Sequence, residues 1–247
     1  MGDQEKLPQK GNDAAPVSKA ARTSEVDAFL QKVAAMPKVK AAGPRGRLLF
    51  ALDATASRQP TWDKACEIQA EMFAATAALG GLDVQLAYYR GFGEFEASAW
   101  LGNASDLTRL MTSVVCLGGR TQIGRVLDHA LAETRHRKVN ALIFVGDSVE
   151  EPVDGLCDRA GRLGVIGLPL FLFHEGQDAR AGDAFRQMAR LSGGACCPFD
   201  ANSADQLKAL LRAVAVYAAG GWQALVDHSR GAGESVRLLT RQLGPKN

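Results

Sequence analysis

The sequence lacks the features that mark a membrane-spanning or secreted protein. Its 247 residues contain no run of about eighteen consecutive apolar side chains, so no transmembrane helix is predicted. Residues 1–6 (MGDQEK) have no apolar core of a secretory signal, and Lys6 stands where a myristoylation signal has Ser or Thr. These absences favour a cytoplasmic protein with no membrane partner.

The sequence also lacks a strong charge of either sign and a paired set of cysteines. A formal net charge of +2 gives no reason to expect nucleic acid as a partner. The five cysteines are scattered and odd in number, which is typical of buried free thiols in a reducing compartment. Cys196 and Cys197 are neighbours, and neighbouring side chains of a strand point to opposite faces, so we interpret them as buried strand residues.

Several nucleotide-binding and catalytic motifs are missing. No Gly-Lys-Ser or Gly-Lys-Thr is present, so the chain is not a P-loop ATPase, and Gly91-x-Gly93 lacks the third glycine of a dinucleotide-binding motif. His174 ends a predicted strand, but no nucleophile elbow accompanies it, and we interpret it as a solvated residue. His129 and His136 lie on a predicted helix and are interpreted as surface residues.

The composition that remains is globular, with 47% hydrophobic and 23% charged residues, and it predicts one sizeable domain with extensions. Residues 1–46 are expected to form an arm that is disordered at its start and carries a short amphipathic helix over residues 24–36. Residues 47–219 are expected to form the domain, and residues 220–247 a tail of short helices.

From residue 47 onward, short apolar strands alternate with helical patterns. This alternation predicts an α/β fold with a doubly wound, mostly parallel sheet and helices on both faces. Glycines between residues 88–90 and residues 94–97 predict a hairpin into one antiparallel edge strand. The predicted strands are 47–53, 83–90, 94–100, 140–146, 168–173 and 194–199, and the predicted helices are 60–79, 104–115, 122–135, 154–164, 180–191 and 203–218.

Oxygen-bearing side chains follow the first predicted strand. Residues 48–52 (LLFAL) have the character of a buried parallel strand, and Asp53, Thr55 and Ser57 come directly after them. Because alternate residues can point the same way, these three side chains can converge on one point. They leave the carboxyl end of the strand, where open α/β sheets place their ligands.

Two later segments end in the same kind of residue. Thr121 follows Gly118-Gly119 at the start of a predicted helix, and Asp147 follows the apolar strand 141–146. The five side chains offer only oxygen, with no Cys or His among them. Such a set predicts a site for a hard divalent cation, with Mg²⁺ favoured because it takes few protein ligands and keeps other positions for water or a partner.

These three segments together resemble the von Willebrand factor A (VWA) domain and its metal-ion-dependent adhesion site (MIDAS). The resemblance covers about residues 47–218. The family pattern Asp-x-Ser-x-Ser departs here at Thr55, which keeps the hydroxyl and adds a methyl group. Residues 118–121 (GGRT) resemble the second loop of the family site, and residues 146–148 (GDS) resemble the third.

The resemblance implies a Rossmann-like VWA fold and one bound Mg²⁺ or Mn²⁺. It implies that Thr55, Ser57 and Thr121 contact the ion directly or nearly so, while Asp53 and Asp147 act mostly through water. The implied function is a protein-binding module without catalysis, in which the ion captures an Asp or Glu of a partner protein. By family analogy, the partner would be a AAA+ ATPase or another assembly factor.

Other interpretations stay open at this point. A hydrolase would use the ion to activate water, with His174 or Glu151 as the base, and an inert scaffold would act through its terminal arms. A phosphatase of the haloacid dehalogenase type is disfavoured, because Thr55 stands where its second Asp would be.

Two further alternatives concern the loops themselves. Asp53 and Thr121 could simply cap helices. Glu150, Glu151 and Asp154 could form a charged helix start, or they could surround the metal and influence which ligands approach it.

Overall fold

The structure, a computed structural model, describes residues 45–199 and 204–243. By its contacts the chain divides into two units, Met1–Lys40 and Ala41–Asn247, and all the described residues belong to the second. The helix expected over residues 24–36 lies outside the described residues.

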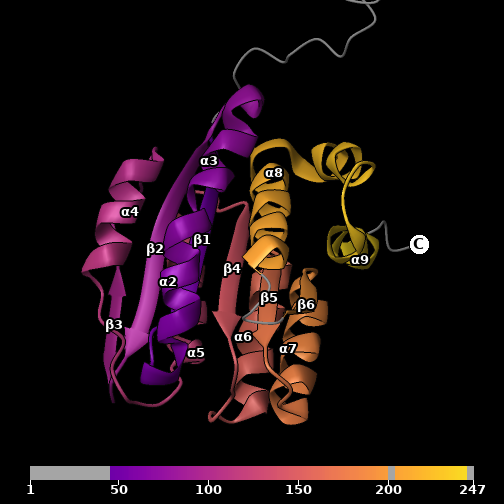
Figure 1. The fold of residues 1–247 in the computed structure, drawn as a ribbon. Coiled ribbons are helices and arrows are strands. Elements are labelled where there is room, and N and C mark those ends of the chain that lie inside the picture. Colours follow the sequence, from indigo (N-terminus) through magenta and orange to yellow (C-terminus); the bar gives the residue numbers. More distant parts are fainter. Residues whose placement is uncertain (1–44, 200–203, 244–247) are drawn as a thin grey trace, which may run out of the picture. The chain divides into compact units, whose positions relative to one another are not determined.

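A six-stranded sheet forms the centre of this unit (Figure 1). Its strand order is β3-β2-β1-β4-β5-β6, and every neighbouring pair is parallel except β2 and β3, which are antiparallel. This confirms the predicted sheet and its edge hairpin. The strands are β1 (Gly46–Asp53), β2 (Leu82–Arg90), β3 (Glu94–Ala97), β4 (Ala141–Gly146), β5 (Leu170–Glu175) and β6 (Ala195–Phe199).

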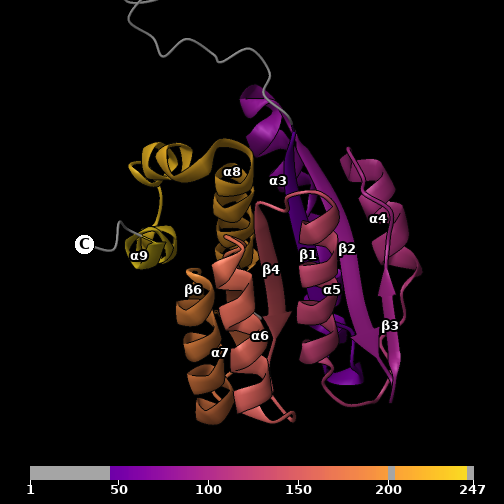
Figure 2. The ribbon, with the colours of Figure 1, turned by 180° about the vertical axis from the view of Figure 1, so that it is seen from behind.

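Helices cover both faces of the sheet, as predicted. One face carries α2 (Gln59–Ile68), α3 (Ala70–Thr76), α4 (Ala104–Ser113) and α8 (Ala204–Ser229). The other face carries α5 (Ile123–His136), α6 (Val153–Val165) and α7 (Ala179–Ser192), which lie in front in Figure 2. The remaining elements are the 3₁₀ turns η1 (Ala56–Arg58) and η2 (Ala77–Leu79) and the last helix, α9 (Glu234–Leu243).

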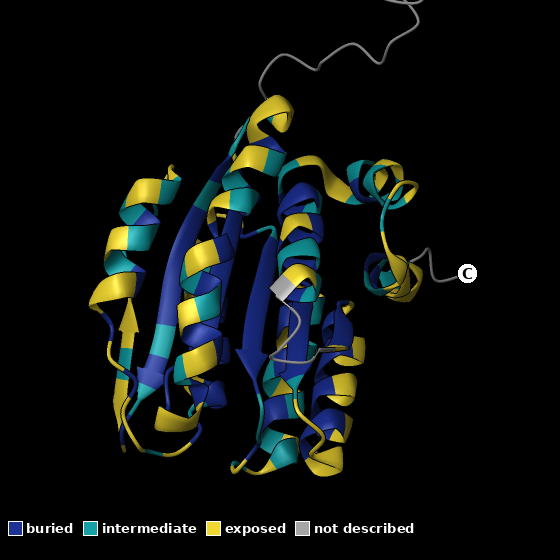
Figure 3. Cartoon of the chain, viewed as in Figure 1, coloured by how far each residue is buried: buried dark blue, intermediate teal, exposed yellow. Residues whose placement is uncertain are grey.

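The sequence of β1 shows why both faces must be covered. All eight of its residues are buried, and Figure 3 shows the strand in the buried colour. Leu48, Phe50 and Leu52 belong to the core under α2 and α8, while Leu49 and Ala51 belong to the core under α5. A continuous apolar run is therefore required here, since neither face of the strand meets water.

Two predicted elements differ in extent. The segment predicted as one helix over residues 60–79 is broken at Gln69 into α2 and α3 and ends in η2. The Gln69 side-chain amide donates to the Thr108 hydroxyl and to the Ala104 carbonyl, and it thereby links the break between α2 and α3 to α4. The predicted strand 94–100 ends at Ala97, and Leu101 alone then pairs with Val84.

The helix α8 is longer than predicted. Its segment Asp205–Ser229 is long and apolar enough to cross a membrane by length and composition alone. In the fold it is a core helix, because Leu207, Leu210, Leu211 and Val214 are fully or almost fully buried under the sheet. It bends at Gly221, whose φ of 73° is not helical.

The chain after this bend returns to the sheet. The side-chain amide of Gln242 in α9 donates to the carbonyl of Cys196 at 2.9 Å, and its oxygen accepts from the Cys196 N–H at 2.9 Å. The tail thereby covers the exposed edge of β6, an edge that would otherwise offer unpaired backbone groups.

Candidate metal centre

The predicted metal residues lie where the winding of the sheet reverses. The chain runs from β1 to β2 on one side of β1, and from β4 to β5 and β6 on the other. Asp53 is the last residue of β1, and Asp147 directly follows β4, so both leave adjacent strands at their carboxyl ends. In open α/β sheets, such a reversal leaves a crevice outside these strand ends.

Four of the five predicted residues line one hollow at these strand ends. Asp53, Thr55, Ser57 and Thr121 surround a volume of about 230 Å³, which we call the strand-end hollow. The residues that complete its lining are Ala56, Gly118, Gly119, Ser148 and Glu150. The structure therefore brings together oxygen donors from three segments far apart in the sequence.

The Asp53 carboxylate is buried and holds the first loop. Its Oδ1 accepts from the N–H of Thr55 at 2.7 Å, and only 3% of the residue is exposed. The pKa of Asp53 is raised overall. Burial raises it most, the negative charge of Asp147 raises it further, and hydrogen bonds from Thr55 offset part of the rise. A cation in the hollow would favour the charged form that burial disfavours.

Thr121 is held by the loop after β4. Its N–H donates to Oε2 of Glu150 at 2.9 Å, and its Oγ1 accepts from the Glu150 N–H at 3.0 Å. Thr121 does not cap α5, because the residue before that helix is Gln122, which makes no side-chain cap. The capping alternative for Thr121 is therefore wrong.

The cap of α5 comes from Glu151 instead. Its carboxylate accepts from the N–H groups of Ile123 and Gly124, each at 2.8 Å. A carboxylate at a helix N-terminus is stabilised by unpaired N–H groups and by the helix dipole. Of the three acids considered from sequence, Glu150 reaches the strand-end hollow, Glu151 caps α5, and Asp154 lies in the first turn of α6.

Asp147 is absent from the lining and pairs instead with Arg58. Its carboxylate lies 3.7 Å from the Arg58 guanidinium, which is 3% exposed and also pairs with Glu175. Thr61 donates its hydroxyl to Glu175 at 2.5 Å. This buried pair beside the site was missed from the sequence, where the only signal was an arginine directly after Ser57.

Two histidine interpretations need correction. His174 is buried, not solvated, with its ring edge-on to Phe185 at 5.4 Å, and burial lowers its pKa. His129 is only partly exposed, with its ring 5.4 Å from Phe95 and Nε2 3.0 Å from the Gln85 side-chain oxygen. His136 is exposed, as expected.

The cysteines follow the expectation of free thiols. All five are unpaired in the structure, and Cys196 and Cys197 belong to the cores on opposite faces of the sheet. Burial raises the pKa of Cys196 to about 11 and that of Cys197 to about 12, which keeps both protonated at neutral pH.

The lining of the strand-end hollow fits a hard cation. Four hydroxyls, from Thr55, Ser57, Thr121 and Ser148, and the carboxylates of Asp53 and Glu150 are the ligand type that Mg²⁺ and Mn²⁺ accept. Within residues 45–199 and 204–243, no group of three or more His, Cys, Asp or Glu side chains is arranged to hold a metal. A site here therefore depends on hydroxyls, which lower its negative charge and its affinity.

A close backbone contact fixes the second loop of the hollow. A Cβ added to Gly119 would lie 1.9 Å from the Gly91 carbonyl oxygen, whereas one added to Gly118 would meet nothing within 4 Å. The loop can therefore lie against the β2–β3 turn only because residue 119 is glycine.

We expect Gly119→Ala to weaken Mg²⁺ binding and to lower the free energy of unfolding by about 1–3 kcal/mol, the usual cost of overpacking. Calorimetry and urea denaturation would measure the two effects. Gly118→Ala is the matched control for packing, because its added methyl group meets nothing within 4 Å, and it should leave the free energy of unfolding near wild type. Equal behaviour of the two variants would show that the contact does not position the loop.

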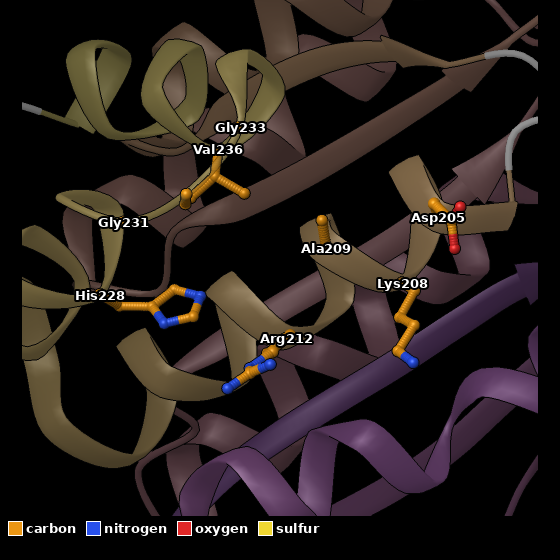
Figure 4. Close-up of a pocket in the computed structure, with 9 residues that line it drawn as sticks. Asp205, Lys208, Ala209, Arg212, His228, Gly231, Gly233 and Val236 are labelled. Carbon is orange, nitrogen blue, oxygen red and sulfur yellow. The ribbon is translucent and has the colours of Figure 1, made fainter.

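A larger cavity, of about 480 Å³, lies between α8 and α9 (Figure 4). Lys208, Arg212 and His228 line it, together with Asp205, and Lys208 is paired with Glu71 at 3.0 Å. None of the predicted metal residues borders this cavity. Its charges of both signs single out no class of ligand.

Comparison with known proteins identifies the fold. No family model and no curated protein matches the chain. Among solved structures, the VWA domain of SpRpn10 aligns with 66% of this chain and 95% of its own, at 11% identity and a TM-score of 0.53. The vWF domain of the type V pili tip protein Mfa5 from Porphyromonas gingivalis aligns with 78% and 99%, at 10% identity and a TM-score of 0.57.

The chain has the von Willebrand factor A fold. A third VWA-fold neighbour is proximal thread matrix protein 1 from the mussel byssus, whose structure has a zinc-occupied MIDAS motif. It aligns with 78% of this chain and 52% of its own, at 14% identity and a TM-score of 0.53. At such identities the likeness establishes the fold of this chain and says nothing of its site.

Proposed function

We propose that this VWA-fold domain binds one Mg²⁺ or Mn²⁺ and uses it to capture an Asp or Glu side chain of a partner protein. The residues proposed to hold the ion are Asp53, Thr55, Ser57 and Thr121, which line the hollow, with Asp147 acting through water from its position beside Arg58. The observation that carries the proposal is the convergence of oxygen donors from three loops on the strand-end hollow, at the reversal point of the sheet.

The chain's own residues suit this task. Asp53 holds the first loop in place, and the bonds between Thr121 and Glu150 hold the second loop against the third. An ion supplies a positive charge that a partner's carboxylate can contact directly. Most of the proposed ligands are uncharged hydroxyls, so the bound ion would keep most of its positive charge for the partner's carboxylate.

The named neighbours support protein binding as the general role. One is the tip protein of a pilus and another is the VWA domain of SpRpn10. For this chain we propose a protein partner in the cytoplasm, either a AAA+ ATPase or another assembly factor. The small net charge supports neither nucleic acid nor a membrane as the partner.

Hydrolysis is less well supported, because neither proposed base is available. His174 is buried against Phe185 and does not line the strand-end hollow. Glu151 accepts two backbone hydrogen bonds at the start of α5. A general base must reach the water that it deprotonates, and these positions favour binding over catalysis.

The proposed function is tested by capture from an extract of the native host. In Mg²⁺, wild type should retain one partner protein reproducibly, and in chelator it should lose that protein. Asp53→Ala should fail to retain it in either condition. Asp158→Ala, which removes an exposed carboxylate of α6, should behave as wild type. A partner retained equally in chelator would show that the metal does not mediate the contact.

A further inference from the structure

We infer that an apolar patch beside the strand-end hollow selects partners whose metal-binding carboxylate is flanked by a bulky apolar side chain. The patch consists of Phe92, Val115 and Leu117. The inference rests on the proposed function, since the metal contact supplies the acidic half of the recognition.

The three side chains are unusually exposed for their type. Phe92 is 83% exposed, Val115 60% and Leu117 40%. They come from the β2–β3 turn and from the segment between α4 and α5, both at the carboxyl ends of the parallel strands. Exposed apolar side chains that gather beside a polar site mark surfaces of interaction.

The other large exposed apolar side chains of the described residues lie elsewhere. Val165 is the last residue of α6 and Ile166 follows it, at the opposite edge of the sheet, and Leu191 lies near the end of α7. Leu79 ends η2, and Leu238 is on α9. The patch is therefore the exposed apolar group that adjoins the metal residues.

Backbone contacts hold Leu117 next to the metal loops. Its N–H donates to the Ala54 carbonyl at 3.0 Å, between Asp53 and Thr55 of the first loop. The next residue, Gly118, already lines the strand-end hollow. A ligand whose carboxylate enters the hollow therefore passes close to Leu117.

The rest of the patch is held just as firmly. The Arg90 guanidinium donates to the Val115 carbonyl at 2.9 Å, and the Arg120 N–H donates to the Gly91 carbonyl at 3.1 Å. The β2–β3 turn that bears Phe92 is thus tied to the segment that bears Val115. Little conformational freedom is lost when a ligand covers side chains whose backbone is already fixed.

The charges around the patch favour an acidic ligand. Arg90 is the last residue of β2, Arg120 lies in the loop before α5, and Arg125 lies in the first turn of α5. Arg90 is paired with Glu94, while Arg125 donates to the Gly93 carbonyl. Basic groups beside the patch and a cation in the hollow complement an acidic segment and disfavour a basic one.

Selection from a library of random linear displayed peptides would test the inference. With Mg²⁺ present and elution by chelator, we expect enrichment of peptides in which Asp or Glu adjoins Phe, Trp, Leu, Ile or Met. The best peptide, synthesised and titrated, should bind Phe92→Ser/Val115→Ser at least roughly tenfold more weakly than wild type. Val165→Ser, which removes an 89% exposed side chain at the opposite edge, is the matched control and should bind as wild type.

The outcomes separate the inference from the proposed function. Enrichment of acidic peptides with no apolar preference, released by chelator, would overturn the patch and leave the metal-mediated contact standing. Enrichment of apolar peptides that chelator does not release would overturn the metal-mediated contact and, with it, this inference. Absence of any Mg²⁺-dependent enrichment would count against both.

Discussion

Asp53→Ala is expected to abolish the heat of Mg²⁺ and Mn²⁺ binding in calorimetry. The substitution removes the buried carboxylate of the strand-end hollow and the acceptor that holds the Thr55 N–H. The proposed site offers the ion few charged ligands, so removal of one carboxylate should lower the affinity until no binding is detected at the same ion concentration. Asp158→Ala removes the same charge from the exposed face of α6 and should bind as wild type.

Thermal unfolding gives a second measurement of the same site. An ion that binds only the folded chain stabilises it by mass action, and at a hundredfold excess over Kd the melting temperature should rise by roughly 5–10 °C. The rise should vanish in Asp53→Ala and in Asp147→Ala/Thr121→Ala. Equal heat and an equal rise in the variants would mean that the ion binds elsewhere.

Arg58→Met is expected to lower the free energy of unfolding by about 3–5 kcal/mol, the usual effect of breaking a buried ion pair. The guanidinium is 3% exposed and its nearer partner Glu175 is 12% exposed, so the variant leaves a mostly buried carboxylate without its cation and also removes the cation beside Asp147. Arg58→Met/Glu175→Gln removes both charges and should recover most of the loss. Urea denaturation at neutral pH would measure the free energy of unfolding of wild type, the single variant and the double variant.

A surface pair supplies the control for that experiment. Arg159 pairs with Asp128 at 3.0 Å, and the two side chains are 35% and 51% exposed. Because exposed pairs contribute little, Arg159→Met should cost no more than about 1 kcal/mol. An Arg58→Met loss as small as that, or a double variant no more stable than the single one, would contradict the role given to the buried pair.

The sequence made the fold predictable because its signals are local and periodic. Apolar runs such as residues 48–52 can be satisfied only by a strand covered on both faces, and the helical patterns between them supply the cover. Gly91, at φ 60°, lies in the hairpin that the glycines between residues 88–90 and residues 94–97 predicted. The ends of α8 and β3 were predicted wrongly, because contacts with neighbouring elements decide where each one stops.

The candidate site was predictable to the same degree. Parallel strands bring their carboxyl ends to one edge of the sheet, so residues that follow β1 and β4 had to meet there. That rule placed Asp53, Thr55 and Ser57 at the same edge as the loop after β4, and Thr121 joins them because it directly precedes α5, whose start lies at that edge. It could not show that Asp147 turns toward Arg58, because a strand-end residue has several rotamers and its partner decides among them.

The sequence by itself thus determined the order of the elements, the doubly wound sheet and the edge at which the oxygen-bearing side chains gather. Tertiary structure alone decided that Arg58 is buried with Glu175, that Glu151 caps α5, that Gly119 lies against Gly91 and that His174 is enclosed. Each of these contacts joins residues from different loops or layers. Their energies depend on burial and distance after the sheet has formed, and no local pattern of residues carries that information.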